Sequence, residues 1–113
     1  MGEKRVLPDD PLAFIKRCVR ARKLFWTWHV NLRLQKRFIS REMILEALGS
    51  YELIESYPED KYLPSYLVYG RQGNTVFHVL FAVDVPEENV RVVTAYHPRP
   101  EEWSEDLKRR KQS

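Results

Sequence analysis

The chain has 113 residues, 43% of them hydrophobic and 12% aromatic, which predicts one packed domain spanning residues 1–113 and leaves no room for two independent cores. Its single cysteine, Cys18, excludes an internal disulfide and a multi-cysteine zinc site. No apolar run approaches the roughly 18 residues of a membrane span, and the polar segment from Met1 to Leu7 lacks a signal-peptide core, so a cytoplasmic protein is expected.

The charge is distributed unevenly along the chain, although the net charge is only +3. Up to Arg41, eleven Lys/Arg face three Asp/Glu, a local charge of +8, and from Glu42 to Asp106 four face thirteen, a local charge of −9. The last seven residues add +4. Solvated helix faces explain any one basic helix, but basic segments at both ends favour a nucleic acid or an acidic protein as partner.

The N-terminal third predicts two helices. Asp10 can cap a helix over residues 11–23, and Pro11 suits its first turn because a proline there loses no hydrogen bond. Residues 24–28 are compact and aromatic and fit a short strand, and a second helical pattern runs from His29 to Arg37. The apolar residues of the first helix recur at helical spacing: Leu12, Ile15, Cys18 and Val19.

The helix from Arg41 to Leu48 has the clearest boundaries. Ser40 is a good capping residue, and Ile39 and Ile44 occupy the two positions of a hydrophobic staple. Gly49 supplies a left-handed residue that would end the helix.

After Gly49 the pattern changes to strands over residues 51–57, 65–71, 75–85 and 90–97, joined by short turns such as Gln72-Gly73-Asn74. Short turns imply a four-stranded, mainly antiparallel sheet, so the fold class is α+β, with N-terminal helices on the sheet. A basic C-terminal helix over residues 100–111 is expected to dock through Trp103 and Leu107. Alternation in the third strand predicts that one face forms the centre of the core: Phe77, Val79, Phe81 and Val83.

Three segments carry a more specific signal. Residues 51–71 (YELIESYPEDKYLPSYLVYGR) form an acidic strand-turn-strand, and residues 92–103 (VVTAYHPRPEEW) lead from an Ala-Tyr pair into prolines and a tryptophan. Upstream, WH…R…ISREMILEAL combines a histidine that opens a helix with a capped second helix. Together these segments, about residues 24–103, resemble a bacterial and archaeal DUF-type domain family of unknown function that is similar to BrnT and MqsR toxins.

This resemblance implies a RelE-like fold and a toxin-like component of a toxin–antitoxin system. It further implies a metal-independent endoribonuclease without a cofactor, accompanied by a small zinc-finger antitoxin of the YgiT type and acting on RNA. A shared fold does not transfer function, however. A non-catalytic module that binds protein or nucleic acid therefore stays open as the alternative.

Cleaving RNA without a metal requires a base, an acid and cations that hold the phosphate. His29, Arg33 and Arg37 follow at i, i+4 and i+8, so a helix would place them in one row beside a phosphate. The same row is also, and more simply, explained as the polar surface of an amphipathic helix, with His29 as a cap or a partly buried donor.

His78 and Tyr96 form the second candidate pair. With a five-residue loop from Val85 to Asn89, Asp84 pairs with Val90 and His78 falls opposite Tyr96, away from the core face. Such a pair can act as an acid–base couple or simply hydrogen-bond across the sheet. A shift of one residue in the loop would separate them.

The remaining candidates are cations that could contact phosphates. Arg71 lies at a hairpin edge, and the C-terminal tail carries Lys108, Arg109 and Arg110, which could equally be a solvated helix end. The carboxylates between Glu52 and Asp60 have no metal-ligand spacing and are interpreted as solubilising, and no metal site is predicted.

Overall fold

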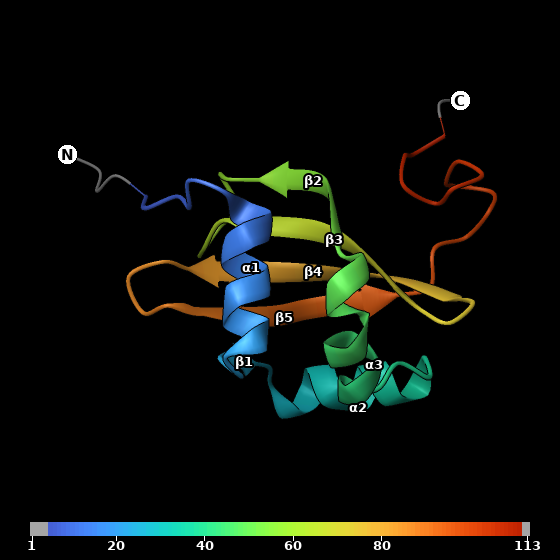
Figure 1. Ribbon diagram of the computed structural model, residues 1–113, viewed down its shortest axis with the longest axis horizontal. Coiled ribbons are helices and arrows are strands. Elements are labelled where there is room, and N and C mark those ends of the chain that lie inside the picture. The colour runs from blue at the N-terminus through green and yellow to red at the C-terminus, as the bar shows by residue number, and fades with distance from the viewer. Residues whose placement is uncertain (1–4, 112–113) are drawn as a thin grey trace.

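The structure, a computed structural model, describes residues 5–111. Within these residues, three α-helices, one 3₁₀ helix and five strands follow one another (Figure 1). The helices precede most of the sheet, as the sequence predicts. The elements are α1 (Pro11–Arg20), β1 (Leu24–Phe25), α2 (Trp28–Lys36), α3 (Arg41–Glu46), a 3₁₀ helix (Ala47–Ser50), β2 (Glu52–Tyr57), β3 (Ser65–Gln72), β4 (Thr75–Asp84) and β5 (Asn89–Tyr96).

The strands form one mixed sheet in the order β1-β5-β4-β3-β2. The α+β class is confirmed, but the predicted four-stranded sheet lacks the edge strand β1, which runs parallel to β5. Leu24 and Phe25 pair with Val90 and Arg91, and Val90 N–H donates to the Lys23 carbonyl at 3.1 Å. The chain leaving α1 therefore adds a short strand to the edge of β5, at the place where the sequence predicts one.

The predicted helix starts are confirmed by their caps. Asp10 Oδ1 accepts from Ala13 N–H at 3.1 Å, and Ser40 Oγ accepts from Met43 N–H at the same distance. The predicted helix ends are less accurate. The first helix stops at Arg20, and Arg22 takes a left-handed φ of 63°. The prediction that Gly49 ends α3 in a left-handed conformation is wrong, because α3 instead tightens into the 3₁₀ helix that contains Gly49.

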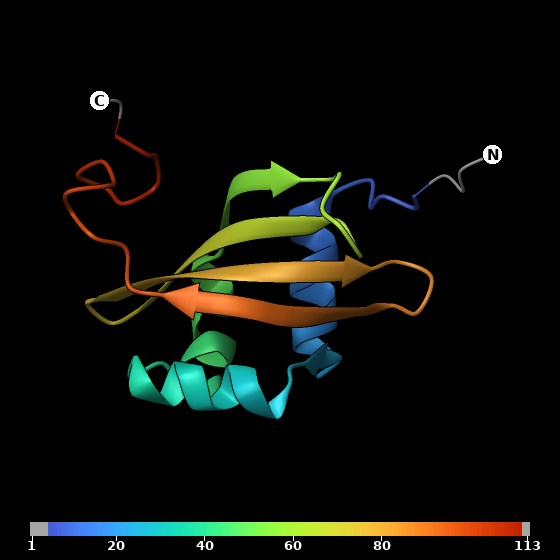
Figure 2. The ribbon, with the colours of Figure 1, turned by 180° about the vertical axis from the view of Figure 1, so that it is seen from behind.

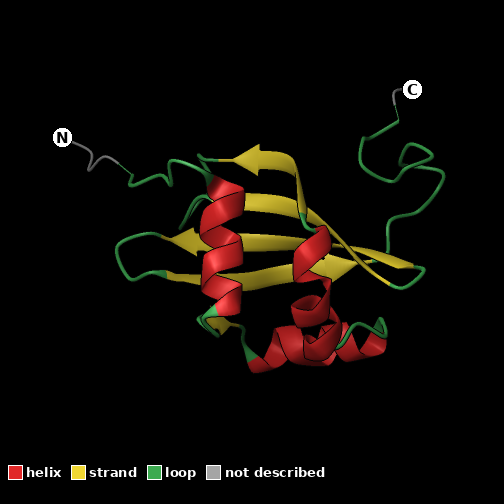
Figure 3. Ribbon diagram, viewed as in Figure 1, coloured by secondary structure: helices red, strands yellow, loops and turns green. Residues whose placement is uncertain are grey.

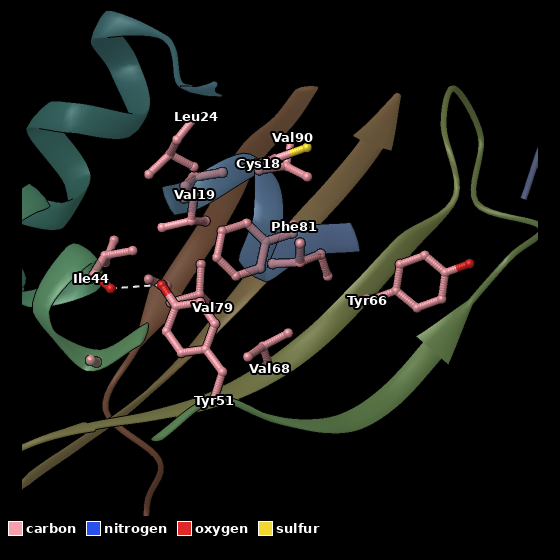
Figure 4. Close-up of a cluster of buried hydrophobic side chains, with 14 of the residues drawn as sticks. Cys18, Val19, Leu24, Ile44, Tyr51, Tyr66, Val68, Val79, Phe81 and Val90 are labelled. Carbon is pink, nitrogen blue, oxygen red and sulfur yellow. Dashed lines mark hydrogen bonds between the residues drawn. The ribbon is translucent and has the colours of Figure 1, made fainter. Parts of the chain in front are cut away.

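One face of the sheet carries α1 and α3, and this face holds the core (Figures 1 and 3). The predicted core face of β4 is confirmed, since Phe77, Val79, Phe81 and Val83 are fully buried. Figure 4 shows Tyr51 reaching into this layer, where its hydroxyl donates to the Ile44 carbonyl at 2.6 Å. That bond ties the start of the sheet to α3.

From behind, β4 and β5 are seen directly, with no helix of the described residues in front of them (Figure 2). We call this the helix-free face. At the end of the sheet where β5 stops, residues 98–111 continue as turns and contact β2 through Lys108–Glu52 and Arg110–Glu55. None of the helices within residues 5–111 is long and apolar enough to cross a membrane.

The predicted C-terminal helix over residues 100–111 is therefore wrong. Ser104 Oγ accepts from Arg109 N–H at 3.1 Å and Asp106 Oδ1 accepts from Lys108 N–H at 3.0 Å, so short polar side chains bind N–H groups that a helix would use. Leu107 has a left-handed φ of 63°. An isolated antiparallel bridge joins Trp103 to Arg110 and closes the segment.

Candidate acid–base site on the helix-free face

A groove of about 610 Å³ lies on the helix-free face. Its floor is formed by Leu67, Leu80 and Thr94, one each from β3, β4 and β5. The end of β2 and the following turn, residues 56–60, form one wall. Tyr96 and Arg110 complete the lining, so the groove combines an apolar floor with polar groups at its margin.

The register of the strands determines which side chains reach this groove. Cross-strand partners share a face of the sheet, and residues two apart along one strand do the same. Glu55 of β2 pairs with Leu67 of β3, and His78 of β4 pairs with Tyr96 of β5. A bulge between Leu53 and Glu55 shifts the register of β2, which brings Glu55 to the same face as Leu67.

His78 is fully buried, and both of its ring nitrogens have partners. Nε2 lies 2.7 Å from the Leu107 carbonyl and Nδ1 lies 3.3 Å from the Tyr96 hydroxyl. A carbonyl only accepts, so Nε2 carries the hydrogen and Nδ1 accepts from Tyr96. Burial lowers the pKa of His78, outweighing the bond to Leu107 that raises it, and the imidazole is neutral near pH 7.

Trp103 covers this histidine. Its ring meets the His78 ring edge to face at 4.4 Å between centroids and is itself buried. Arg110 lies over the Trp103 ring, with its guanidinium carbon 4.6 Å from the ring centroid. The C-terminal segment therefore both seals His78 and carries Arg110 to the groove.

Arg110 holds a carboxylate of β2 in a two-pronged ion pair. Its Nε lies 2.7 Å from Glu55 Oε2 and its Nη2 lies 3.2 Å from Glu55 Oε1, and the Tyr57 hydroxyl donates to the same carboxylate. The hydrogen bond from Arg110 lowers the pKa of Glu55 more than burial raises it. Glu55 is thus an ionised carboxylate in a half-buried position.

Tyr96 lies between buried His78 and the Arg110–Glu55 ion pair. Burial raises the pKa of its hydroxyl, and nearby Arg110 lowers it by a smaller amount. The phenol is therefore protonated at neutral pH and lies between buried His78 and the groove. The phenol of Tyr96 and the guanidinium of Arg110 line the groove, and the Glu55 carboxylate is bonded to two lining residues, Arg110 and Tyr57. A carboxylate acceptor, a phenol donor and a guanidinium are the components of acid–base chemistry on a phosphate ester.

The predicted juxtaposition of His78 and Tyr96 is confirmed, although the predicted loop is wrong. Asp84 pairs with Asn89 rather than Val90, so the turn is one residue shorter than expected. A bulge in β5, opposite the step from Leu80 to Phe81, restores the register before Tyr96. The shorter turn and the bulge each shift the register by one residue in opposite directions, so His78 and Tyr96 remain on one face.

The structure does not bring the helical row to this groove. His29 and Arg33 are exposed on α2 and do not line it. Arg37 instead turns toward the sheet, where its Nη1 donates to the Ala95 carbonyl at 2.7 Å and to Thr94 Oγ1 at 3.2 Å. The catalytic role predicted for His29 would thus belong to a different surface from that of His78 and Tyr96.

The other predicted phosphate contacts are separated as well. Arg71 Nε donates to the Gly73 carbonyl at 2.7 Å and closes the hairpin. Lys108 Nζ lies 2.6 Å from Glu52 Oε2, and Arg109 is exposed. Of these cations only Arg110 lines the groove.

Glu55 and Tyr57 are the site residues that the sequence interpretation missed, because it assigned the acidic segment to solubility. Their spacing of two residues within a predicted strand indicates a shared face and was the available signal. Within residues 5–111, no cluster of three or more His, Cys, Asp or Glu side chains could hold a metal ion.

Comparison with known proteins places part of the chain in a family. The family model described as Domain of unknown function (DUF4258) matches residues 26–97. No curated protein and no solved structure gives a significant match. The matched region ends one residue after Tyr96 and excludes the segment that carries Trp103 and Arg110.

Proposed function

We propose that this chain, which belongs to the DUF4258 family, is a toxin-like endoribonuclease that cleaves RNA at the groove without a metal ion. The observation that carries this proposal is that Tyr96 and Arg110 line one groove, where Arg110 is paired with the carboxylate of Glu55 behind the lining. The resemblance of the sequence to RelE-like toxins supports the same reaction. The proposal rests on the chemistry of these residues.

Each group has a definite part in the proposed reaction. Glu55 accepts the proton of the ribose 2′-hydroxyl, whose oxygen attacks the adjacent phosphorus. Arg110 stabilises the charge that develops on the phosphate oxygens. Tyr96 donates its proton to the departing 5′-oxygen, which leaves a 2′,3′-cyclic phosphate and a 5′-hydroxyl. Solvent returns the Tyr96 proton and removes the one on Glu55.

His78 is a positioning residue in this scheme. It is buried beneath Trp103 and reaches the groove only through the Tyr96 hydroxyl. The separation of 3.3 Å is long for an O–H···N bond, so the hydroxyl can turn to a leaving oxygen when RNA is bound. The bond to the Leu107 carbonyl keeps the histidine in the tautomer that accepts from Tyr96.

As a toxin-like protein the chain would have an antitoxin partner, for which a YgiT-type zinc-finger protein is the candidate that the resemblance suggests. The basic N-terminal region, with its local charge of +8, is suited to a partner of opposite charge. Expression of the chain alone should then slow growth, and coexpression of the partner should relieve it.

The decisive experiment measures cleavage of end-labelled RNA by purified protein in excess EDTA, with and without ribosomes. Glu55→Gln, Tyr96→Phe and Arg110→Gln should each reduce the rate by about 100-fold or more. Glu101→Gln and Tyr62→Phe are matched exposed controls outside the groove and should cleave as the wild type does.

Two results would contradict the proposal. Absence of cleavage by the wild type under both conditions would remove the enzymatic function. Cleavage that persists in Glu55→Gln but disappears in His29→Ala would move the active site from the groove to α2.

A non-catalytic binding module is the second candidate. It is favoured by the pairing of Arg110, which lines the groove, with Glu55 and of nearby Lys108 with Glu52, which leaves less positive charge for a phosphate. Under this alternative the wild type does not cleave RNA, yet it retains a partner in pull-down experiments from its own host.

A further inference from the structure

A second cleft, of about 540 Å³, lies between α2 and the start of α3, and we call it the α2–α3 cleft. Both helices lie beside each other at one end of the helical layer (Figure 3). Trp28, Asn31 and Gln35 line the cleft from α2, Trp26 precedes them, and Arg41 belongs to α3. We propose that this cleft binds an unpaired nucleobase of single-stranded RNA.

The aromatic wall provides the surface for stacking. Trp28 is 68% exposed, which is unusual for an indole that has neighbouring apolar residues to pack against. Trp26 is half-buried beneath the Arg41 guanidinium, at 5.5 Å from the ring centroid. Bases stack on such exposed indoles irrespective of sequence, because every base has a π-face.

The helix supplies polar groups that match the edge of a base. Trp28, Asn31 and Gln35 are three and four residues apart, so the indole and both amides share one side of α2. Within residues 5–111 the structure gives neither side-chain amide a hydrogen-bond partner, whereas Gln72 uses its amide on Glu46. An amide donates and accepts at once, the pattern that the N6 and N7 positions of adenine require.

The charge around the cleft suits the backbone that carries the base. Arg41 is exposed and lines the cleft, and Glu42 is the one carboxylate that lines it among the described residues. A phosphate flanking a bound base would find the Arg41 guanidinium at the edge of the cleft. The groove on the helix-free face differs in this respect, since its wall contains Glu59 and Asp60.

This site does not require the groove to cleave anything. It depends on the proposed function only in naming RNA as the nucleic acid. A 2′-O-methylated ligand separates the two ideas, because it lacks the attacking hydroxyl and cannot be cleaved by the proposed route.

The experiment measures fluorescence anisotropy of labelled, 2′-O-methylated hexa-adenylate with the purified full chain. Trp28→Ala should weaken binding by at least about fivefold. Asn31→Ala and Gln35→Ala should weaken it by a smaller factor, and both substitutions favour helix formation, so α2 should persist. Leu32→Ala is the matched control, exposed on the same helix and absent from the cleft, and it should bind as the wild type does.

An abasic version of the same oligomer tests the nucleobase itself, since it retains the phosphates. We expect it to bind at least about fivefold more weakly to the wild type and equally to wild type and Trp28→Ala. Equal affinity of the wild type for the two oligomers overturns the proposal, because charge alone then accounts for binding. So does equal weakening by Leu32→Ala, or binding of an acidic peptide in place of either oligomer.

Discussion

The two faces of the sheet are built differently, although β4 contributes alternate residues to both. On the helix-covered face, Phe77, Val79, Phe81 and Val83 meet α1 and α3 in a layer from which water is excluded. On the helix-free face, the alternate residues of β4 have different neighbours. His78 contacts the C-terminal segment, and Leu80 lines the groove. The first face can be filled with any well-packed apolar side chains, whereas the second depends on particular polar ones.

A buried histidine is costly unless both nitrogens are hydrogen-bonded. His78 obtains its two partners from Tyr96 and Leu107, and its cover from Trp103. The segment after β5 is therefore part of the folded domain, although it contains neither a helix nor a named strand. It stabilises the helix-free face in the way that helices stabilise the other.

The largest effect should come from the helix-covered face. Phe81→Ala leaves a cavity among fully buried residues and should lower the free energy of unfolding by about 4 kcal/mol. Leu80→Ala, one residue away, removes a side chain that lines an open groove and should lower it by about 1 kcal/mol. Urea unfolding followed by circular dichroism measures both values. Equal losses would break the distinction between the faces.

Trp103→Ala should follow, with a loss of about 3 kcal/mol. Trp103 is buried against His78, but the segment that carries it can relax into the space left behind. The same unfolding measurement gives the magnitude. Amide hydrogen exchange should show increased exchange in residues 98–111, with little change in β3. A loss below about 0.5 kcal/mol would mean that the segment is a tail and not a cover.

Much of this contrast can be predicted from the sequence. Alternation in residues 75–85 identifies the apolar face of β4, and Ser40 with Ile39 and Ile44 identifies the start of α3, because these signals are local. The parallel pairing of β1 with β5 cannot be predicted in this way, because two paired residues are too few to show an alternation of apolar and polar side chains. The spacing of Trp103 and Leu107 favours a C-terminal helix, but local bonds of Ser104 and Asp106 override that spacing.

The site is less predictable than the fold, because its members are distant in sequence. Arg110 meets Glu55 across 55 residues, and the face occupied by Glu55 depends on a bulge. The sequence predicts the pairing of His78 with Tyr96 from a loop that is one residue too long, and a second bulge, in β5, compensates for the difference. A single change of register reverses the face of every later side chain, so a site on a sheet is only as predictable as its bulges.

The pH dependence of stability sharpens the comparison further. Histidine ordinarily titrates near 6.5, and burial lowers the pKa of His78 in the folded chain. As the pH falls below about 6.5, His78 binds a proton in the unfolded chain before it does so in the folded chain. The stability contributed by His78 is therefore complete above about pH 6.5 and decreases as the pH falls below it. Urea unfolding at about pH 7.5 and about pH 5.5 measures the difference.

His78→Gln should reduce this decrease, because glutamine can still donate to Leu107 but does not titrate. His29→Gln removes an exposed histidine and should leave the decrease unchanged. Glu55 does not contribute to the difference between these two pH values. Its pKa is lowered in the folded chain, so the stability that it contributes is lost only below about pH 4.5. A decrease that survives in His78→Gln would assign it to another group.

The smallest effect on stability should come from the Glu55–Arg110 pair. More than half of the Arg110 side chain is exposed, and exposed ion pairs contribute less than about 1 kcal/mol. Arg110→Gln should therefore change the free energy of unfolding hardly more than Arg99→Gln, which breaks a pair exposed on both sides. The same Arg110→Gln variant should lose about 100-fold in RNA cleavage if the proposed function holds. A loss of several kcal/mol in urea unfolding would instead make the pair structural, and the helix-free face would then resemble the core that it is contrasted with.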